Sequence, residues 1–322
     1  MTGAHAQHVV DITRTLERSA ARVEEHRRDR WSFLLSDGAG LRATAVIDDG
    51  WLLLDGPLPE SRDMDHDSRF WQLLQWNATL PGGAKFAVLA AGPEVHVRAE
   101  LPLDDDVNLP RRVVQVCAGL NTAAARLAHR EALGSPLSPR EGHGEGAQWI
   151  GGKNSGPPNP HPAGYEFVPD LAEQCRASGW TLAERAGGLV VELDDPGSFR
   201  QAIVEAKAGH GTAVRVDVAT NSEAPATPCR EALALLLLRT SGIVRMVRAT
   251  GQRDGSAARF EVLFTDPPCA SELAHAFSAL SVACRIAGRE AAVLQHDERV
   301  ASEYLRVAMR NASDVKGNRA DS

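Results

Sequence analysis

Three adjacent carboxylates at Asp104, Asp105 and Asp106 are the side chains whose type best suits a hard cation. Carboxylate oxygens are the ligands that calcium and magnesium prefer, so such a cluster could form a metal site. Consecutive side chains point in different directions, however, and acids ahead of a helix cap it and meet the positive end of its dipole. We therefore interpret the three as capping groups for a helix at residues 110–131, and we expect no metal site.

Other patterns that could support catalysis are weak. The glycine-rich run GHGEG at residues 142–146 is similar to a phosphate-binding loop, but such a loop joins a strand to a helix, and neither is expected here. His210 lies between two glycines and is interpreted first as a turn residue. The other histidines considered as ligands share no metal-binding spacing: His5, His8, His66, His143 and His161. The sequence lacks the HExxH, GxSxG, Walker and CxxC motifs, so we expect no catalytic residue, no cofactor and no enzymatic activity.

Composition and charge narrow the class of protein. Hydrophobic residues make up 43% and charged residues 24% of the 322 residues, values typical of soluble globular proteins. The net charge of −7 argues against a nucleic-acid partner, and the densest basic run, residues 26–30, is interpreted as a solvated helix end. No apolar run has the ~20 residues of a membrane span, and the N-terminus has no apolar signal core, so we expect no membrane partner and a cytoplasmic location.

The five cysteines have no spacing that indicates a disulfide framework or a zinc site. Cys117 and Cys284 lie in stretches rich in alanine and leucine that are expected to be helical. A buried thiol behaves as a small hydrophobic side chain, so we expect both cysteines to pack in the core.

Residues 133–164 are rich in glycine and proline and have little apolar surface to bury, which predicts a flexible linker. The linker divides the chain into a first domain at residues 1–132 and a second at residues 165–310, followed by a disordered tail at residues 311–322. Trp149 and Ile150 form one apolar island in the linker and could dock on either domain.

The first domain is predicted to contain an α-β-β-β-α-β-β-α succession. Val9, Ile12, Leu16, Ala20 and Val23 recur at helical spacing, and the strand at residues 94–101 alternates apolar and polar residues, which predicts a sheet wet on one face. The expected helices are residues 9–25, 68–79 and 110–131, and the expected strands are residues 31–35, 41–47, 51–54, 85–89 and 94–101.

The second domain can be divided in the same way. The expected helices are residues 168–177, 229–239 and 271–287, with a final helix at 297–309, and the expected strands are residues 180–184, 189–193, 213–218, 243–249 and 258–264. Residues 194–212 are interpreted as an insertion that carries a short helix at 199–206. The predicted fold class is α+β, with two tandem domains that each pack a mainly antiparallel sheet on helices.

This pattern resembles the type III secretion chaperone-like family and, more loosely, its YbjN-like relatives. The stretch most similar to them is LLQWNATLPGGAKFAV at residues 73–88, in which a helix runs through Pro-Gly-Gly into a strand, followed by the strand at 95–101 and an Asp-rich start to the last helix. The resemblance covers both halves in topology and about residues 70–130 in motif. It implies a small cytoplasmic protein that dimerises and offers sheet and helix surfaces to a client polypeptide.

We therefore expect a non-catalytic protein-binding module with a protein or peptide client. The two copies would form an intramolecular pseudo-dimer, since a flexible linker of roughly thirty residues spans about 30 Å, and assembly into a homo-oligomer stays open. The alternative is a small-molecule-binding regulator or enzyme with a site between the domains. The nominated partner-binding residues are Phe33, Leu35, Trp51, Leu53, Val214, Val216, Phe260 and Val262. The competing interpretation of these alternating apolar residues is that they face the core.

Overall fold

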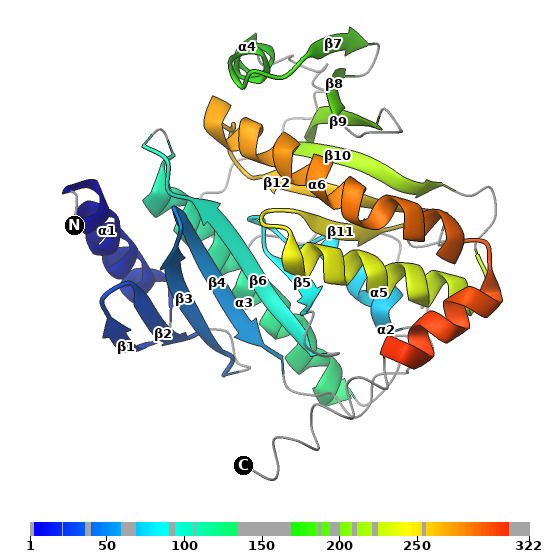
Figure 1. Ribbon diagram of the computed structural model, residues 1–322. Coiled ribbons are helices and arrows are strands. Elements are labelled where there is room, and N and C mark those ends of the chain that lie inside the picture. Colours follow the sequence, from blue (N-terminus) through cyan, green and yellow to red (C-terminus); the bar gives the residue numbers. More distant parts are fainter. Residues whose placement is uncertain are drawn as a thin grey trace, which may run out of the picture.

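The computed structural model shows an α+β protein built from two six-stranded antiparallel sheets and the helices that pack on them (Figure 1). It describes residues 3–20, 22–35, 40–58, 69–89, 94–105, 107–133, 169–185, 188–193, 200–207, 211–220, 225–252 and 256–308. Residues 134–164 of the predicted linker, with Trp149, Ile150 and the glycine-rich run at 142–146, lie outside these residues, as does the predicted tail. Leu133, the first residue of the predicted linker, is still helical. The predicted fold class is confirmed.

The first half contains three helices and six strands. The helices are α1 (Gly3–Ser19), α2 (Arg69–Asn77) and α3 (Leu109–Leu133), and the strands are β1 (Arg22–Arg27), β2 (Arg30–Leu34), β3 (Arg42–Asp48), β4 (Trp51–Pro57), β5 (Lys85–Val88) and β6 (Val95–Pro102). In this sheet, called sheet A, the spatial order of the strands is β1-β2-β3-β4-β6-β5. Sheet A is therefore a four-stranded meander extended by a hairpin.

The second half repeats this order of elements. The helices are α4 (Pro169–Ala177), α5 (Thr227–Ile243) and α6 (Ala270–Leu294), and the strands are β7 (Leu182–Arg185), β8 (Gly188–Leu193), β9 (Arg200–Lys207), β10 (Gly211–Thr220), β11 (Arg248–Gly251) and β12 (Ala257–Phe264). In sheet B the order is β7-β8-β9-β10-β12-β11, so each strand has a counterpart in sheet A. A further helix at residues 298–308 extends the second half as predicted.

The predicted helix at residues 9–25 is wrong in its last part. The helix ends at Ser19, and residues 22–27 form the edge strand β1. Val23 matched the helical spacing by chance, because β1 is largely exposed and is held by backbone hydrogen bonds to β2 rather than by an apolar face. The basic run at residues 26–30 is consequently a hairpin between β1 and β2 and not a helix end.

The predicted insertion is also wrong. Residues 200–207 form β9, which pairs with β8 on one side and β10 on the other, so the expected short helix at 199–206 is a central strand. β9 is the counterpart of β3, and the two halves match more closely than the sequence indicated. The expected strand at 243–249 begins only at Arg248, because Ile243 is the last residue of α5 and Met246 has a positive φ of 64° in the turn that follows.

The core lies on one face of each sheet. On sheet A the inward side chains are fully buried and include Trp31, Phe33, Leu52, Leu54 and Val97. The indole Nε1 of Trp31 donates a hydrogen bond to Thr13 Oγ1 of α1, at 3.0 Å, which places α1 over this face. In Figure 1, α3 runs behind sheet A and α6 runs in front of sheet B, so the two sheets bury opposite faces.

The two halves meet through equivalent elements. Helix α2 packs against α5, α2 against β11 and α5 against β5, while β5 and β11 lie next to each other at the centre of the molecule (Figure 1). Each helix at this contact packs against the other helix and against the central edge strand of the other half. Such reciprocal contacts are the pattern of a two-fold symmetric interface. Sheet edges β1 and β7 lie far from this contact.

The second half also covers part of sheet A that was expected to be wet. His96 and Glu100 were predicted to face water from β6, but both are buried. Arg98, between them, donates a hydrogen bond to the carbonyl of Gly242 in α5, at 2.6 Å. The alternation in β6 is therefore genuine, but its polar face lies against the second half. None of the described helices has the length and apolar character needed to span a membrane.

Candidate functional site

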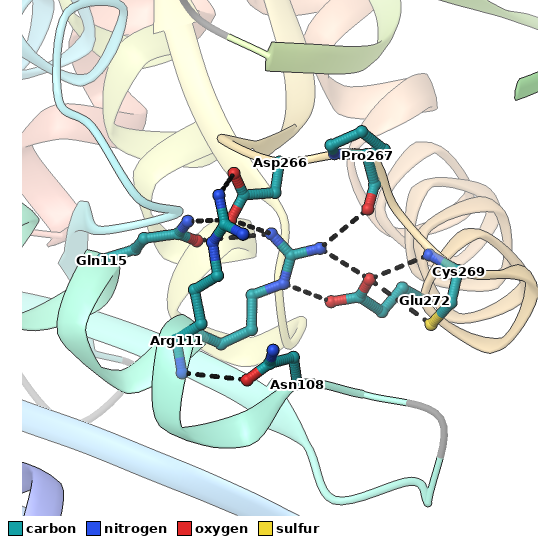
Figure 2. A network of polar contacts seen from close by, with 8 residues as sticks. Asn108, Arg111, Gln115, Asp266, Pro267, Cys269 and Glu272 are labelled. Carbon is teal, nitrogen blue, oxygen red and sulfur yellow. Dashed lines mark hydrogen bonds and ion pairs between the residues drawn. The ribbon is translucent and has the colours of Figure 1, made fainter. Parts of the chain in front are cut away.

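One acid lies ahead of α3 and one ahead of α6, and each reaches the long helix of the other half. Asp104 Oδ2 lies 2.8 Å from His275 Nε2 on α6. Asp266 accepts hydrogen bonds from Arg111, at 2.6 Å, and from Gln115, both on α3 (Figure 2). Asp104 thus joins the halves, and the capping group of α3 is Asn108, whose Oδ1 accepts a hydrogen bond from the Arg111 amide at 3.3 Å. The capping interpretation of Asp104 is wrong.

A buried ion pair joins α3 and α6. Arg112 of α3 donates from Nε and Nη2 to the two carboxylate oxygens of Glu272 of α6, each at 2.7 Å. Glu272 also accepts a hydrogen bond from the Cys269 amide, at 3.1 Å, as part of the capping box of α6 (Figure 2). Such a two-pronged pair between planar groups is strong and fixes the relative position of the two helices.

Lys85 and Arg248, the first residues of β5 and β11, act in a reciprocal way. Lys85 Nζ is fully buried, lies 2.9 Å from Glu100, and donates to the carbonyls of Val244 and Val247 in the turn before β11. Arg248 pairs with Glu261 and donates to the carbonyl of Leu80, ahead of β5, at 2.7 Å. Each cation therefore satisfies backbone carbonyls of the other half. Burial lowers the pKa of Lys85, although Glu100 acts in the opposite direction.

A small hollow lies between the halves, where the alternative prediction placed a ligand site. Its polar lining comes mainly from Glu100, Arg112, Gln115, Thr265 and Glu272. The charged groups among them already pair with partners: Arg112 with Glu272, and Glu100 with Lys85. The charges at this contact therefore hold the two halves together.

The described residues contain no group of three or more His, Cys, Asp or Glu side chains that could hold a metal ion. His5 lies 2.9 Å from Asp29 and so links α1 to the β1–β2 turn, and His8 is half-buried on α1. Asp106, His66, His143, His161 and His210 lie outside the described residues. Cys117 and Cys284 are buried in helices, as predicted.

The nominated partner-binding residues fall into two groups. Six are in the core, with at most 4% of their surface exposed, which agrees with the competing interpretation: Phe33, Leu35, Val214, Val216, Phe260 and Val262. Trp51 and Leu53 are half-buried and alternate along β4 with the core residues Leu52 and Leu54. They therefore lie on the opposite face of sheet A, called here the outer face.

The outer face over β2, β3 and β4 carries an apolar patch formed by Val46, Trp51 and Leu53. Val46 and Leu53 are direct cross-strand partners, and all three side chains are half-buried. Ser32 and Thr44 lie on the same face in the next row and are also half-buried. In Figure 1 no described helix passes in front of these three strands, whereas α5 lies in front of β5.

The second half forms one rim of this surface. The ring of His275 meets the edge of Trp51, with ring centroids 5.0 Å apart, and the guanidinium of Arg245 lies 5.5 Å from the Trp51 ring centroid. Arg245 also pairs with Asp48 at 2.8 Å. Ile243 follows Gly242, the residue bonded to Arg98, and is 58% exposed. At this rim the indole ring of Trp51 thus lies beside a cation, Arg245, and near an exposed aliphatic side chain, Ile243.

The equivalent surface of sheet B has a different character. The two sheets can be aligned so that Lys85 of sheet A matches Arg248 of sheet B. In this alignment the positions of Val46, Leu53 and Trp51 are taken by Glu205, Ala213 and Gly211. Glu205 forms an ion pair with Arg215 on the same face. The apolar patch is thus a property of the first half alone.

Sequence reasoning found part of this surface and missed the contact between the halves. Trp51 and Leu53 were nominated, and Val46 could have been, because Thr44 and Val46 alternate with Ala43 and Ala45 in the predicted strand. Lys85, Arg112 and Arg248 carry no local signal, since their partners in the other half lie more than a hundred residues away.

Comparisons with known proteins give no match, whether the chain is scanned against models of protein families or searched against curated proteins and solved structures.

Proposed function

We propose that this chain is a non-catalytic binding protein that holds a segment of a polypeptide partner on the outer face of sheet A. The observation that supports this most is the patch of Val46, Trp51 and Leu53 on a part of the sheet that the described helices leave uncovered. Contiguous apolar surface with a polar surround is typical of a protein interaction site. Ser32 and Thr44 are half-buried polar neighbours of the patch on the same face.

The arrangement of the two halves supports a chaperone-like role. The resemblance to the type III secretion chaperone-like family implies a dimer, and here two equivalent sheets contact each other through α2, α5, β5 and β11. We propose that they act as an intramolecular pseudo-dimer in the cytoplasm. A ligand site between the halves is less well supported, because Arg112, Glu272, Lys85 and Glu100 satisfy one another there.

The test is selection of peptides from a displayed random library with the full chain, followed by calorimetric titration of the selected peptides. Leu53→Ser should weaken binding by about tenfold, since a buried leucine side chain contributes roughly 1.5–3 kcal/mol. Val293→Ser is the matched control, because Val293 is a 47% exposed aliphatic side chain on α6. No enriched peptide, or an equal loss in the two variants, would contradict the proposal.

A further inference from the structure

We infer that the polypeptide bound by the outer face of sheet A is acidic, an inference that rests on the proposed function and names its partner class. The strand register places several charged side chains of β1 and β2 on this face. Cross-strand partners share a face, so the outer residues of β1 and β2 include Arg22, Glu25, Arg27 and Arg30. All four are exposed.

The acids that the described strands of sheet A place on this face are paired. Glu24 pairs with Arg42 at 3.0 Å, and Glu25 pairs with Arg27. Asp48 lies 2.8 Å from Arg245 and Asp55 lies 3.0 Å from Arg98. Glu100, the cross-strand partner of Leu53, pairs with Lys85 at 2.9 Å. Within the described ranges, Arg22 and Arg30 have no acidic partner. Strands β1 and β2 therefore present two cations without a described acidic partner on this face, although the whole chain carries −7.

Arg30 is placed to combine with the apolar patch. It is the direct cross-strand partner of Val46, which in turn lies opposite Leu53, so a cation and two aliphatic side chains form one row across β2, β3 and β4. An extended segment that crosses this row would place an apolar side chain on the patch and a carboxylate at Arg30. Complementary charge of this kind selects among partners that have the same apolar content.

Sheet B gives no equivalent surface. There Arg215 pairs with Glu205 and Asp217, and Arg259 pairs with Asp217, so these two described cations are matched by acids of the same face. The inference therefore assigns the acidic segment to one of two topologically equivalent sheets. The first half would hold the partner, while the second half supplies the rim at Arg245 and His275.

The experiment measures fluorescence polarisation of two labelled peptides of equal length with the full chain. In one, leucine alternates with glutamate; in the other, lysine replaces glutamate. The acidic peptide should bind at least about tenfold more tightly at low salt, and the difference should shrink as salt screens the charges. Arg30→Glu should weaken the acidic peptide by about fivefold or more. Arg289→Glu, the same change at an exposed site on α6, should leave it unaltered.

The outcomes separate the two proposals. Equal affinity for both peptides, with both weakened by Leu53→Ser, would overturn the acidic preference and leave the proposed function standing. A loss in Arg289→Glu as large as that in Arg30→Glu would also overturn the inference, because it would show a response to net charge alone. Absence of binding by both peptides would count against the proposed function and the inference together.

Discussion

Replacement of Arg112 by leucine should destabilise the protein far more than the same replacement in a surface ion pair. The side chains of Arg112 and Glu272 are only 9% and 4% exposed, and two hydrogen bonds of 2.7 Å join them. Removal of one partner from a buried pair leaves a charge without its counter-ion, at a cost of about 3–5 kcal/mol. Glu272 keeps the amide of Cys269 as a donor, so we expect the lower end, about 3 kcal/mol.

The measurement is equilibrium unfolding in urea, with calorimetry as a second readout. At about 2 °C per kcal/mol for a large domain, Arg112→Leu should lower Tm by roughly 6 °C. The double variant Arg112→Leu/Glu272→Leu should lose far less than the sum of the two single variants, because it leaves no orphan charge.

The matched control is Arg306→Leu. Arg306 pairs with Glu303 at 2.6 Å, but both side chains are more than half exposed, so solvent screens the pair and the expected change in the unfolding midpoint is within the error of the measurement. If Arg112→Leu costs no more than Arg306→Leu, or if the two single losses simply add in the double variant, the assigned role of the buried pair is refuted.

Three further results are expected from the remaining buried groups. Burial lowers the pKa of Lys85 below 10.5, so the unfolded chain binds more protons than the folded chain between the folded and the unfolded pKa of this residue. The free energy of unfolding should therefore rise with pH in that range. The same slope against pH in Lys85→Met as in the unaltered protein would contradict this. Burial raises the pKa of Cys117 to about 12, so in native protein the half-buried Cys269 should react first with a disulfide reagent, and an unchanged fast phase in Cys269→Ser would oppose this. A Cβ on Gly242 would lie 2.5 Å from the Val88 carbonyl oxygen, so Gly242→Ala should destabilise by about 1–3 kcal/mol in urea unfolding, and no change in midpoint would argue against this close approach.

The sequence predicted the fold class and most elements because their signals are local. The alternation in β4 and β6 and the long apolar periodicity of α3 follow from the chain itself. The errors arose where tertiary contacts decide the conformation. Residues 22–27 are charged and exposed, and residues 200–207 also fit a helical pattern, so pairing with neighbouring strands determines both.

The candidate surface was only partly predictable for a related reason. Alternation identifies which side chains share a face, but it does not say which face the helices cover. Phe33 and Leu53 belong to alternating strands of the same kind, yet one is buried and the other is half-buried on the outer face. The contacts of Lys85 and Arg112 with the other half require the three-dimensional arrangement and have no counterpart in local spacing.

Site-specific photo-crosslinking in living cells tests the central claim most directly. A benzophenone amino acid is placed at position 46 on sheet A and, in a second variant, at position 205, the equivalent site on sheet B; Val46 and Glu205 are both half-buried. Position 46 should yield a crosslinked polypeptide whose attached segment is rich in acidic residues, and position 205 should not. Equal crosslinking from both positions, or none from position 46, would contradict the account.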